Sequence, residues 1–138
     1  MPVSDSRDAE LLRVAQDYRE RAWAPMSNYL VGAALLGDDG KVYGGGNVEH
    51  IILGLSCCAE RVAIQSAISE GVRGFSAVAV VTVSSPPAAP CGSCRQMLHT
   101  WGVERVLMGN LDGEVDVSSM SELLPRAFSL KEPLSSGS

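Results

Sequence analysis

The sequence predicts a single α/β domain over residues 1–138, built as a three-layer α/β/α sandwich around a mixed β-sheet. Three observations lead to this fold class. Apolar stretches typical of strands alternate with amphipathic stretches typical of helices. The first two strands are separated by a short turn rich in glycine and aspartate, which predicts an antiparallel hairpin. A later strand is apolar on both faces, as expected for a central strand covered by helices on both sides.

The first half of the chain gives a helix, a hairpin and a second helix. Residues 9–22 carry apolar side chains at helical spacing and predict an amphipathic helix. Residues 29–36 predict the first strand, and residues 41–43 predict its hairpin partner, which leads into three consecutive glycines. Residues 58–70 again keep helical spacing, and Gly71 stands where a C-terminal cap would end the helix.

The second half continues the alternation of strands and helices. Its expected elements are a central strand at 77–83, a loop with three prolines at 84–90, a helix at 91–101, strands at 103–108 and 115–117, and a short helix at 120–128. We expect residues 129–138 to form a flexible tail. Neither an internal repeat nor a domain linker interrupts this order.

Composition limits the partners of the chain. There are 11 Lys and Arg against 16 Asp and Glu, a net charge of −5, and no basic cluster. This balance disfavours binding to a nucleic acid polymer, which depends on basic side chains. The longest apolar run, residues 77–83, is far shorter than the roughly 20 residues of a membrane-spanning helix, and the N-terminus lacks a signal-peptide pattern. We expect a cytoplasmic protein with reduced thiols that acts on a small molecule, with no membrane partner.

The chemistry-bearing residues lie in two short clusters, each at the start of a predicted helix. Cys91 and Cys94 are about one helical turn apart, so both sulfurs can reach one metal ion. The same Cys-x-x-Cys spacing also serves dithiol redox centres, so the pair alone leaves both interpretations open.

Cys58 and Glu60 favour the metal. A third thiolate beside Cys91 and Cys94 leaves the fourth tetrahedral position of a zinc ion open, as in catalytic sites, and Glu60 would lie beside it as general acid and base. Cys57 is a poor fourth ligand because adjacent residues on a helix point about 100° apart, and we expect it to be a small buried apolar residue. Three cysteines with a glutamate that binds no metal are a signature of zinc nucleobase deaminases.

Over nearly its whole length the sequence resembles the small, three-cysteine cytidine deaminases. The matching motifs, in order and spacing, are residues 24–29, 31–35, 46–49, 58–61, 90–96 and 122–128. The resemblance implies a cytidine deaminase-like fold, one Zn²⁺ per subunit, and zinc-dependent hydrolytic deamination of cytidine or deoxycytidine with release of ammonia in pyrimidine salvage. It also implies a homotetramer, with a dimer as the alternative.

The resemblance assigns roles at the metal site residue by residue. It implies that Cys58, Cys91 and Cys94 bind zinc and that Glu60 shuttles protons. Three thiolates make the zinc site negative, and Arg61 matches the family's arginine that offsets this charge from outside the ligand set.

The resemblance also implies the substrate-binding residues. Asn47 and Glu49 would hydrogen-bond the ribose hydroxyls, and Ala59 would contribute to the substrate site. Tyr29 stands where the family usually has a phenylalanine lining the pyrimidine pocket. Phe128 matches an aromatic residue that reaches the site of a neighbouring subunit.

One stretch departs from the family pattern. After Glu49 the chain reads His50-Ile51-Ile52-Leu53, where relatives commonly have polar residues and a tyrosine. His50 is similar to the Asn-Val-Tyr-His motif of blasticidin-S deaminases, so a modified cytosine nucleoside or a blasticidin S-type antibiotic is an alternative substrate. A dithiol oxidoreductase using Cys91 and Cys94, a non-catalytic zinc module and a base-editing enzyme acting on polymers are the remaining alternatives.

Overall fold

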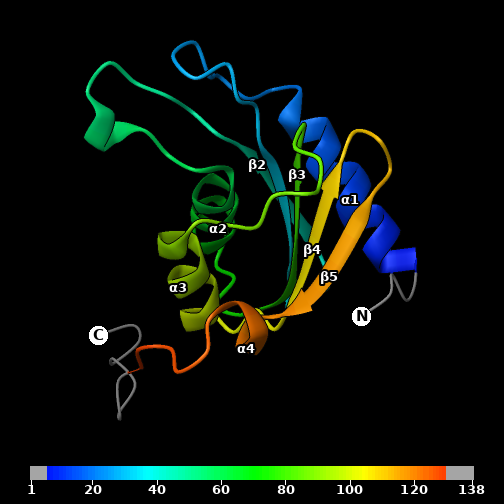
Figure 1. Ribbon diagram of the computed structural model, residues 1–138. Helices are drawn as coiled ribbons and strands as arrows, with labels where there is room; N and C mark the ends of the chain where they lie inside the picture. Colours follow the sequence, from blue (N-terminus) through cyan, green and yellow to red (C-terminus); the bar gives the residue numbers. More distant parts are fainter. Residues whose placement is uncertain (1–5, 130–138) are drawn as a thin grey trace.

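The computed structural model describes residues 6–129. Of the tail expected at 129–138, all but Ser129 lies outside the described residues. Figure 1 shows a twisted sheet with helices on both of its faces. The five strands are β1 (Gly32–Gly37), β2 (Val42–Gly46), β3 (Phe75–Thr82), β4 (Arg105–Asn110) and β5 (Val115–Ser119).

The sheet is mixed, as the sequence predicts. Its strand order is β2-β1-β3-β4-β5. β1 pairs antiparallel with both β2 and β3, β3 and β4 are parallel, and β4 pairs antiparallel with β5. β3 is therefore the central strand, which explains why its residues are apolar on both faces.

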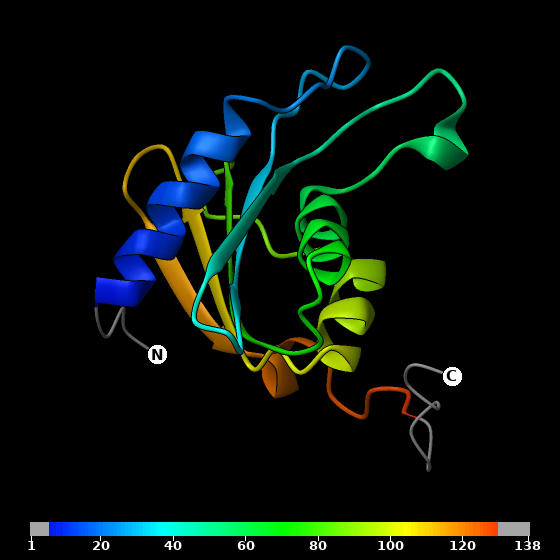
Figure 2. The ribbon, with the colours of Figure 1, turned by 180° about the vertical axis from the view of Figure 1, so that it is seen from behind.

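Helix α1 (Ser6–Arg19) covers one face of the sheet, whereas α2 (Ala59–Ser69) and α3 (Gly92–Thr100) cover the other (Figures 1 and 2). The buried residues Leu11 and Ala15 of α1 belong to one apolar cluster, together with Ala79 of β3. Ile64 of α2 belongs to the second cluster, together with Val78 of β3. The three-layer α/β/α sandwich is confirmed.

Two predicted helices have different ends in the structure. The first ends at Arg19 and not at residue 22, because the N–H groups of Arg21 and Ala22 bond to carbonyls three residues back and tighten the chain into a turn. The helix expected at 120–128 is a single turn, α4 (Met120–Leu123). Leu124 leaves the helical conformation, with φ of −141° and ψ of 69°, and the following Pro125 disfavours helical backbone in the residue before it.

The glycine triplet in β2 lets helices approach the sheet closely from both sides. A Cβ atom on Gly45 would lie 2.5 Å from the backbone nitrogen of Ala63 in α2, and one on Gly44 would collide with the ring of Tyr18 in α1. Because neighbouring residues of a strand face opposite sides, only glycine fits at both positions. This close packing sets α2 firmly against the sheet, with its first residues at the cavity described below.

No helix within residues 6–129 has the length and hydropathy needed to cross a bilayer.

Candidate active site

Three cysteine sulfurs converge from two helix starts. Cys58 is the N-cap of α2, Cys91 is the N-cap of α3, and Cys94 lies in the first turn of α3. Their Sγ atoms all lie within 4.8 Å of one another. The chain therefore brings together all three metal ligands expected from the sequence, although Cys58 and Cys91 are far apart along it.

The donor set fits zinc. Tetrahedral Zn–S bonds of about 2.3 Å place two sulfurs about 3.8 Å apart, a separation that falls within the 4.8 Å limit for these sulfurs. Cys94 and Cys91 hydrogen-bond to Cys58, and these contacts, Cys94 foremost, lower the pKa of the Cys58 thiol. The same contact with Cys58 raises the pKa of Cys94. The three sulfurs thus already face one point, and none of the four cysteines is in a disulfide.

Glu60 follows Ala59 in the first turn of α2, and both residues line the cavity described below. Glu60 is only 4% exposed. Burial raises the pKa of Glu60 to about 7, and the neighbouring Cys58 thiolate acts in the same direction. Arg61, which follows it, is half-buried, and its positive charge helps to lower the pKa of Cys58. This contribution supports the charge-offsetting role that the resemblance implies for Arg61.

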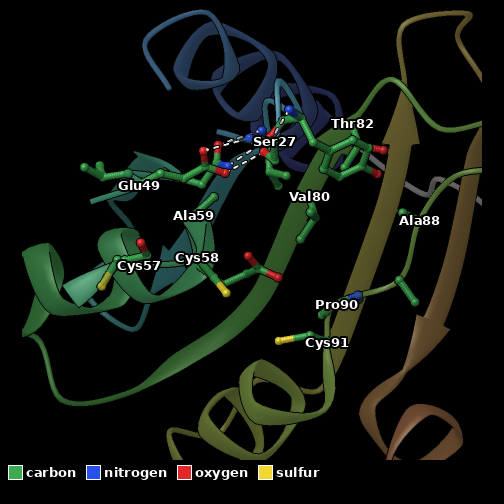
Figure 3. A pocket seen from close by; sticks show the side chains of 17 residues that line it. Ser27, Glu49, Cys57, Cys58, Ala59, Val80, Thr82, Ala88, Pro90 and Cys91 are labelled. Atoms are coloured by element: carbon green, nitrogen blue, oxygen red, sulfur yellow. Dashed lines mark hydrogen bonds between the residues drawn. The ribbon is translucent and has the colours of Figure 1, made fainter. Parts of the chain in front are cut away.

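The cysteine cluster opens into a cavity of about 370 Å³, shown in Figure 3. This volume suits a small-molecule ligand. Most of the expected site residues line it, namely Tyr29, Asn47, Glu49, Cys58, Ala59, Glu60 and Cys91. One cavity therefore joins a cysteine cluster that can hold a metal ion, a buried carboxyl group and a polar wall.

The polar wall is held in place by backbone contacts. The Asn47 side chain accepts a hydrogen bond from the Val31 N–H at 2.9 Å and donates one to the Tyr29 carbonyl at 2.9 Å. Asn47 therefore fixes the chain that enters β1, and within residues 6–129 its second amide N–H has no partner and can bind a ligand.

Glu49 is held by a residue that sequence reasoning did not single out. Its Oε1 accepts from the N–H groups of Met26 at 2.9 Å and Ser27 at 3.1 Å, and its Oε2 accepts from the Ser27 hydroxyl at 2.5 Å. Figure 3 shows the contacts between Ser27 and Glu49 as dashed lines. Ser27, foremost through its hydroxyl, lowers the pKa of Glu49. Ser27 lies in a matching motif, but no local pattern reveals a contact across 22 residues.

Tyr29 uses the hydroxyl group that distinguishes it from phenylalanine. Its Oη lies 2.5 Å from the Ser84 Oγ in the loop after β3, and the two hydroxyls form a hydrogen bond. This contact ties the segment before β1 to the loop that leads toward Cys91. The sequence showed the departure from phenylalanine but not its partner.

Cys57 differs from expectation, whereas Phe128, which is expected to reach the site of a neighbouring subunit, lies outside this cavity. Cys57 is half-buried and not fully buried as predicted, because its backbone pairs with Val48 at the cavity wall. Its side chain points away from Cys58 and Cys91 in Figure 3, which agrees with its exclusion from the ligand set. Phe128 is 70% exposed and does not line this cavity, and its carbonyl accepts a hydrogen bond from Gln96.

Comparisons with known proteins agree with this site. Residues 5–110 match the family model described as the cytidine and deoxycytidylate deaminase zinc-binding region. A cytidine deaminase of Sporosarcina psychrophila is 43% identical over 128 residues, covering 91% of this chain and 93% of the relative.

Solved structures match as well. The crystal structure of cytidine deaminase from Burkholderia pseudomallei aligns with a TM-score of 0.82 and 47% identity, covering 87% of this chain and 98% of that one. The cytidine deaminase from Mycobacterium tuberculosis aligns with a TM-score of 0.77 and 35% identity, covering 91% of this chain and 100% of that one. The chain therefore belongs to the cytidine and deoxycytidylate deaminase family, as a zinc-dependent deaminase.

Proposed function

We propose that this chain converts cytidine and deoxycytidine to uridine and deoxyuridine by hydrolysis, with release of ammonia. The observation that carries the proposal is the cavity in which three cysteine sulfurs, the buried Glu60 and the fixed pair Asn47 and Glu49 meet. A dithiol oxidoreductase needs neither the third sulfur nor the buried carboxyl group.

Cys58, Cys91 and Cys94 would hold one zinc ion per subunit. When bound, zinc with an open fourth position supplies Lewis-acid activation of a water molecule near neutral pH. Arg61 offsets part of the negative charge of three thiolates, which would otherwise weaken that activation.

Glu60 moves the protons. Its carboxylate accepts a proton from the attacking water, and the resulting acid donates to N3 of the pyrimidine ring as C4 is attacked. The carboxylate then takes the proton of the new hydroxyl group on C4 and delivers it to the amino group, so that the C4–N bond breaks, neutral ammonia leaves and the C4 carbonyl of uridine forms. Burial at the start of α2 keeps bulk water from competing for these transfers.

Asn47 and Glu49 supply the sugar subsite. A carboxylate has about four acceptor positions, and Met26 and Ser27 occupy three of those on Glu49. The remaining position and the free N–H of Asn47 give one acceptor and one donor, a pair suited to a ribose hydroxyl. Because both side chains are already fixed, little ordering entropy is lost on binding.

A direct assay tests this function. Protein loaded with zinc and mixed with cytidine should lose the absorbance of cytidine while uridine and ammonia form in equal amounts. Glu60→Ala should retain zinc and lose turnover. Glu70→Gln changes an exposed carboxyl group at the C-terminal end of α2 and serves as the matched control. Full activity of Glu60→Ala would show that the mechanism is wrong.

A second substrate class is favoured by one observation. Leu53 is 73% exposed and lines a small groove with Met26, Ser27 and Glu49, beside the proposed sugar subsite. Leu53 offers no hydroxyl group, where relatives commonly have a tyrosine. The apolar groove would therefore accept nucleosides with larger groups at the 5′ position. Comparing kcat/KM for cytidine, deoxycytidine, 5-methylcytidine, a 5′-modified cytidine and blasticidin S decides between the two classes.

The assembly we propose is a homotetramer, with a dimer as the alternative. Large apolar side chains are exposed near the cavity, among them Ile51 at 91% and Trp23. Such patches mark interaction surfaces, and the family resemblance points to other copies of the chain as their cover, with Phe128 reaching a neighbour's site. Light scattering coupled to size exclusion should give the mass of four chains, and Ile51→Ser should lower it. We place the activity in pyrimidine salvage in the cytoplasm.

A further inference from the structure

The segment that leads into Cys91 has little to hold it. Between β3 and α3 the chain runs through residues 83–90 without helix or strand. The first part is fastened, because the Ser84 carbonyl accepts a hydrogen bond from Asn110 and Ser85 donates one to Glu114. Within the described part of the chain, residues 86–90 make a single hydrogen bond, from the Arg95 Nε–H to the Pro90 carbonyl at 2.7 Å.

Arg95 makes a second contact with the same guanidinium group. Its Nη1–H donates to the carbonyl of Leu123, the last residue of α4, at 2.8 Å. The side chain is half-buried. The planar group therefore holds two backbone carbonyls at once, one directly before a metal ligand and one at the end of a separate helix.

The other two ligands do not depend on such a contact. Cys58 follows Cys57, whose backbone exchanges two hydrogen bonds with Val48, at 2.8 and 3.0 Å. Cys94 lies within α3 and is fully buried. Cys91 is exposed and stands at the end of the weakly held loop. Its sulfur position is therefore the one most sensitive to the restraint on Pro90.

We propose that Arg95 is a positioning residue of the zinc site: it fixes the Pro90 carbonyl against α4 and so keeps the Cys91 sulfur aimed at the other two. The proposal rests on the zinc site of the proposed function but not on its substrate. Residues that orient metal ligands typically change metal affinity 10- to 100-fold when they are replaced.

Arg95→Gln and Arg95→Lys test this role against a matched control. Arg73 also holds two backbone carbonyls through its guanidinium group, those of Ile68 and Val72 at 2.9 and 3.0 Å, but it follows the C-terminal end of α2. Arg73→Gln therefore removes the same kind of contact away from the metal site. Competition with a chelator measures zinc affinity, and the absorption spectrum of the Co²⁺-loaded protein reports how its thiolates are arranged.

We expect Arg95→Gln to bind zinc at least 10-fold more weakly than the unchanged protein and to alter the Co²⁺ spectrum. Arg95→Lys, which reaches one carbonyl at a time, should show a smaller loss of affinity. Arg73→Gln should keep both affinity and spectrum. Circular dichroism of the metal-free variants checks that each is folded, and Arg95→Lys alone decides the matter if Arg95→Gln is not.

Two results would overturn the proposal. One is a zinc affinity of Arg95→Gln, or of Arg95→Lys where only that variant folds, within twofold of the unchanged protein. The other is an equal loss of affinity in Arg73→Gln. A chain that binds zinc tightly but leaves cytidine intact would refute the proposed function and leave the role of Arg95 standing.

Discussion

The two faces of the sheet are covered in similar ways but serve different ends. On the α1 face, aliphatic and alanine side chains fill the space between helix and strands. On the α2 and α3 face, a similar apolar cluster ends at two helix starts, and these starts carry the sulfurs and Glu60. The comparison shows that the reactive side chains lie where α2 and α3 begin. The apolar packing on both faces holds the helices in place.

The buried acidic groups show the same difference. On the α1 face, the Asp8 side chain is 5% exposed and its Oδ2 lies 2.6 Å from the Arg105 Nη2 on β4. On the other face, Glu60 is equally buried, but none of the ion pairs found in residues 6–129 includes it. Asp8 therefore stabilises the fold through a charge partner, whereas Glu60 is left available for proton transfer.

The largest expected effect comes from Glu60→Gln. We expect kcat/KM to fall by about three orders of magnitude, since proton transfer by a positioned group contributes roughly 10²- to 10⁴-fold. The melting temperature should stay equal or rise, because a neutral amide costs less to bury than a carboxylate. Steady-state kinetics and calorimetry measure the two quantities. A large drop in melting temperature would mean that Glu60 is as structural as Asp8.

Asp8→Asn should lower the stability of the fold and leave catalysis unchanged, which is the opposite of the result expected for Glu60→Gln. We expect a loss of about 2 kcal/mol in the free energy of unfolding, because a charge-assisted hydrogen bond to Arg105 is weakened. That corresponds to a melting temperature lower by about 7 °C. Per folded molecule, kcat/KM for cytidine should not change. A tenfold drop in kcat/KM would show that the two faces are coupled.

Ser27→Ala should produce a smaller effect on the site face. Glu49 loses its hydroxyl donor at 2.5 Å, so its carboxylate is less firmly oriented. We expect KM for cytidine to rise about fivefold with little change in kcat, in line with one hydrogen bond of about 1 kcal/mol. Ser66→Ala, at an exposed position of α2, is the control. An unchanged KM would exclude Glu49 from sugar binding.

The smallest expected effect is a shift in the pH below which KM for cytidine rises. Because Ser27 lowers the pKa of Glu49 below its ordinary 4.5, the carboxylate and its acceptor capacity are fully present above that pH. They are lost as pH falls through the lowered pKa, and KM should then rise. In Ser27→Ala the pKa returns toward 4.5, so the rise in KM should begin at a higher pH. Identical acid limbs in the two proteins would contradict this assignment.

Much of the fold follows from local patterns. Residues 77–83 are apolar except for Thr82, and this run predicted the central β3 because a strand covered on both faces is apolar on both. Cys58, Cys91 and Cys94 were predicted as one cluster because helix starts and spacing limit where their sulfurs point. Fold class and ligand set are thus readable from periodicity and residue type.

Other features depend on contacts that periodicity does not encode. Arg95 directly follows Cys94, yet its partner carbonyl on Leu123 is 28 residues away. Ser27 and Glu49 lie on either side of the β1–β2 hairpin, 22 residues apart, and no characteristic spacing links them. Helix α4 was predicted too long because Leu124 continues the apolar pattern, while its non-helical backbone follows from the proline after it. Contacts between residues that are far apart in the sequence can be identified only from the structure.

The placement of the ligands on two separate helices has a consequence for the lifetime of the protein in a cell. An ion held by Cys58 on one side and by Cys91 and Cys94 on the other acts as a cross-link between α2 and α3. Each tenfold rise in free zinc above the dissociation constant then adds about 1.4 kcal/mol to the folded state. Thermal stability should rise with the logarithm of free zinc, so that metal-starved molecules become the first to unfold and be degraded.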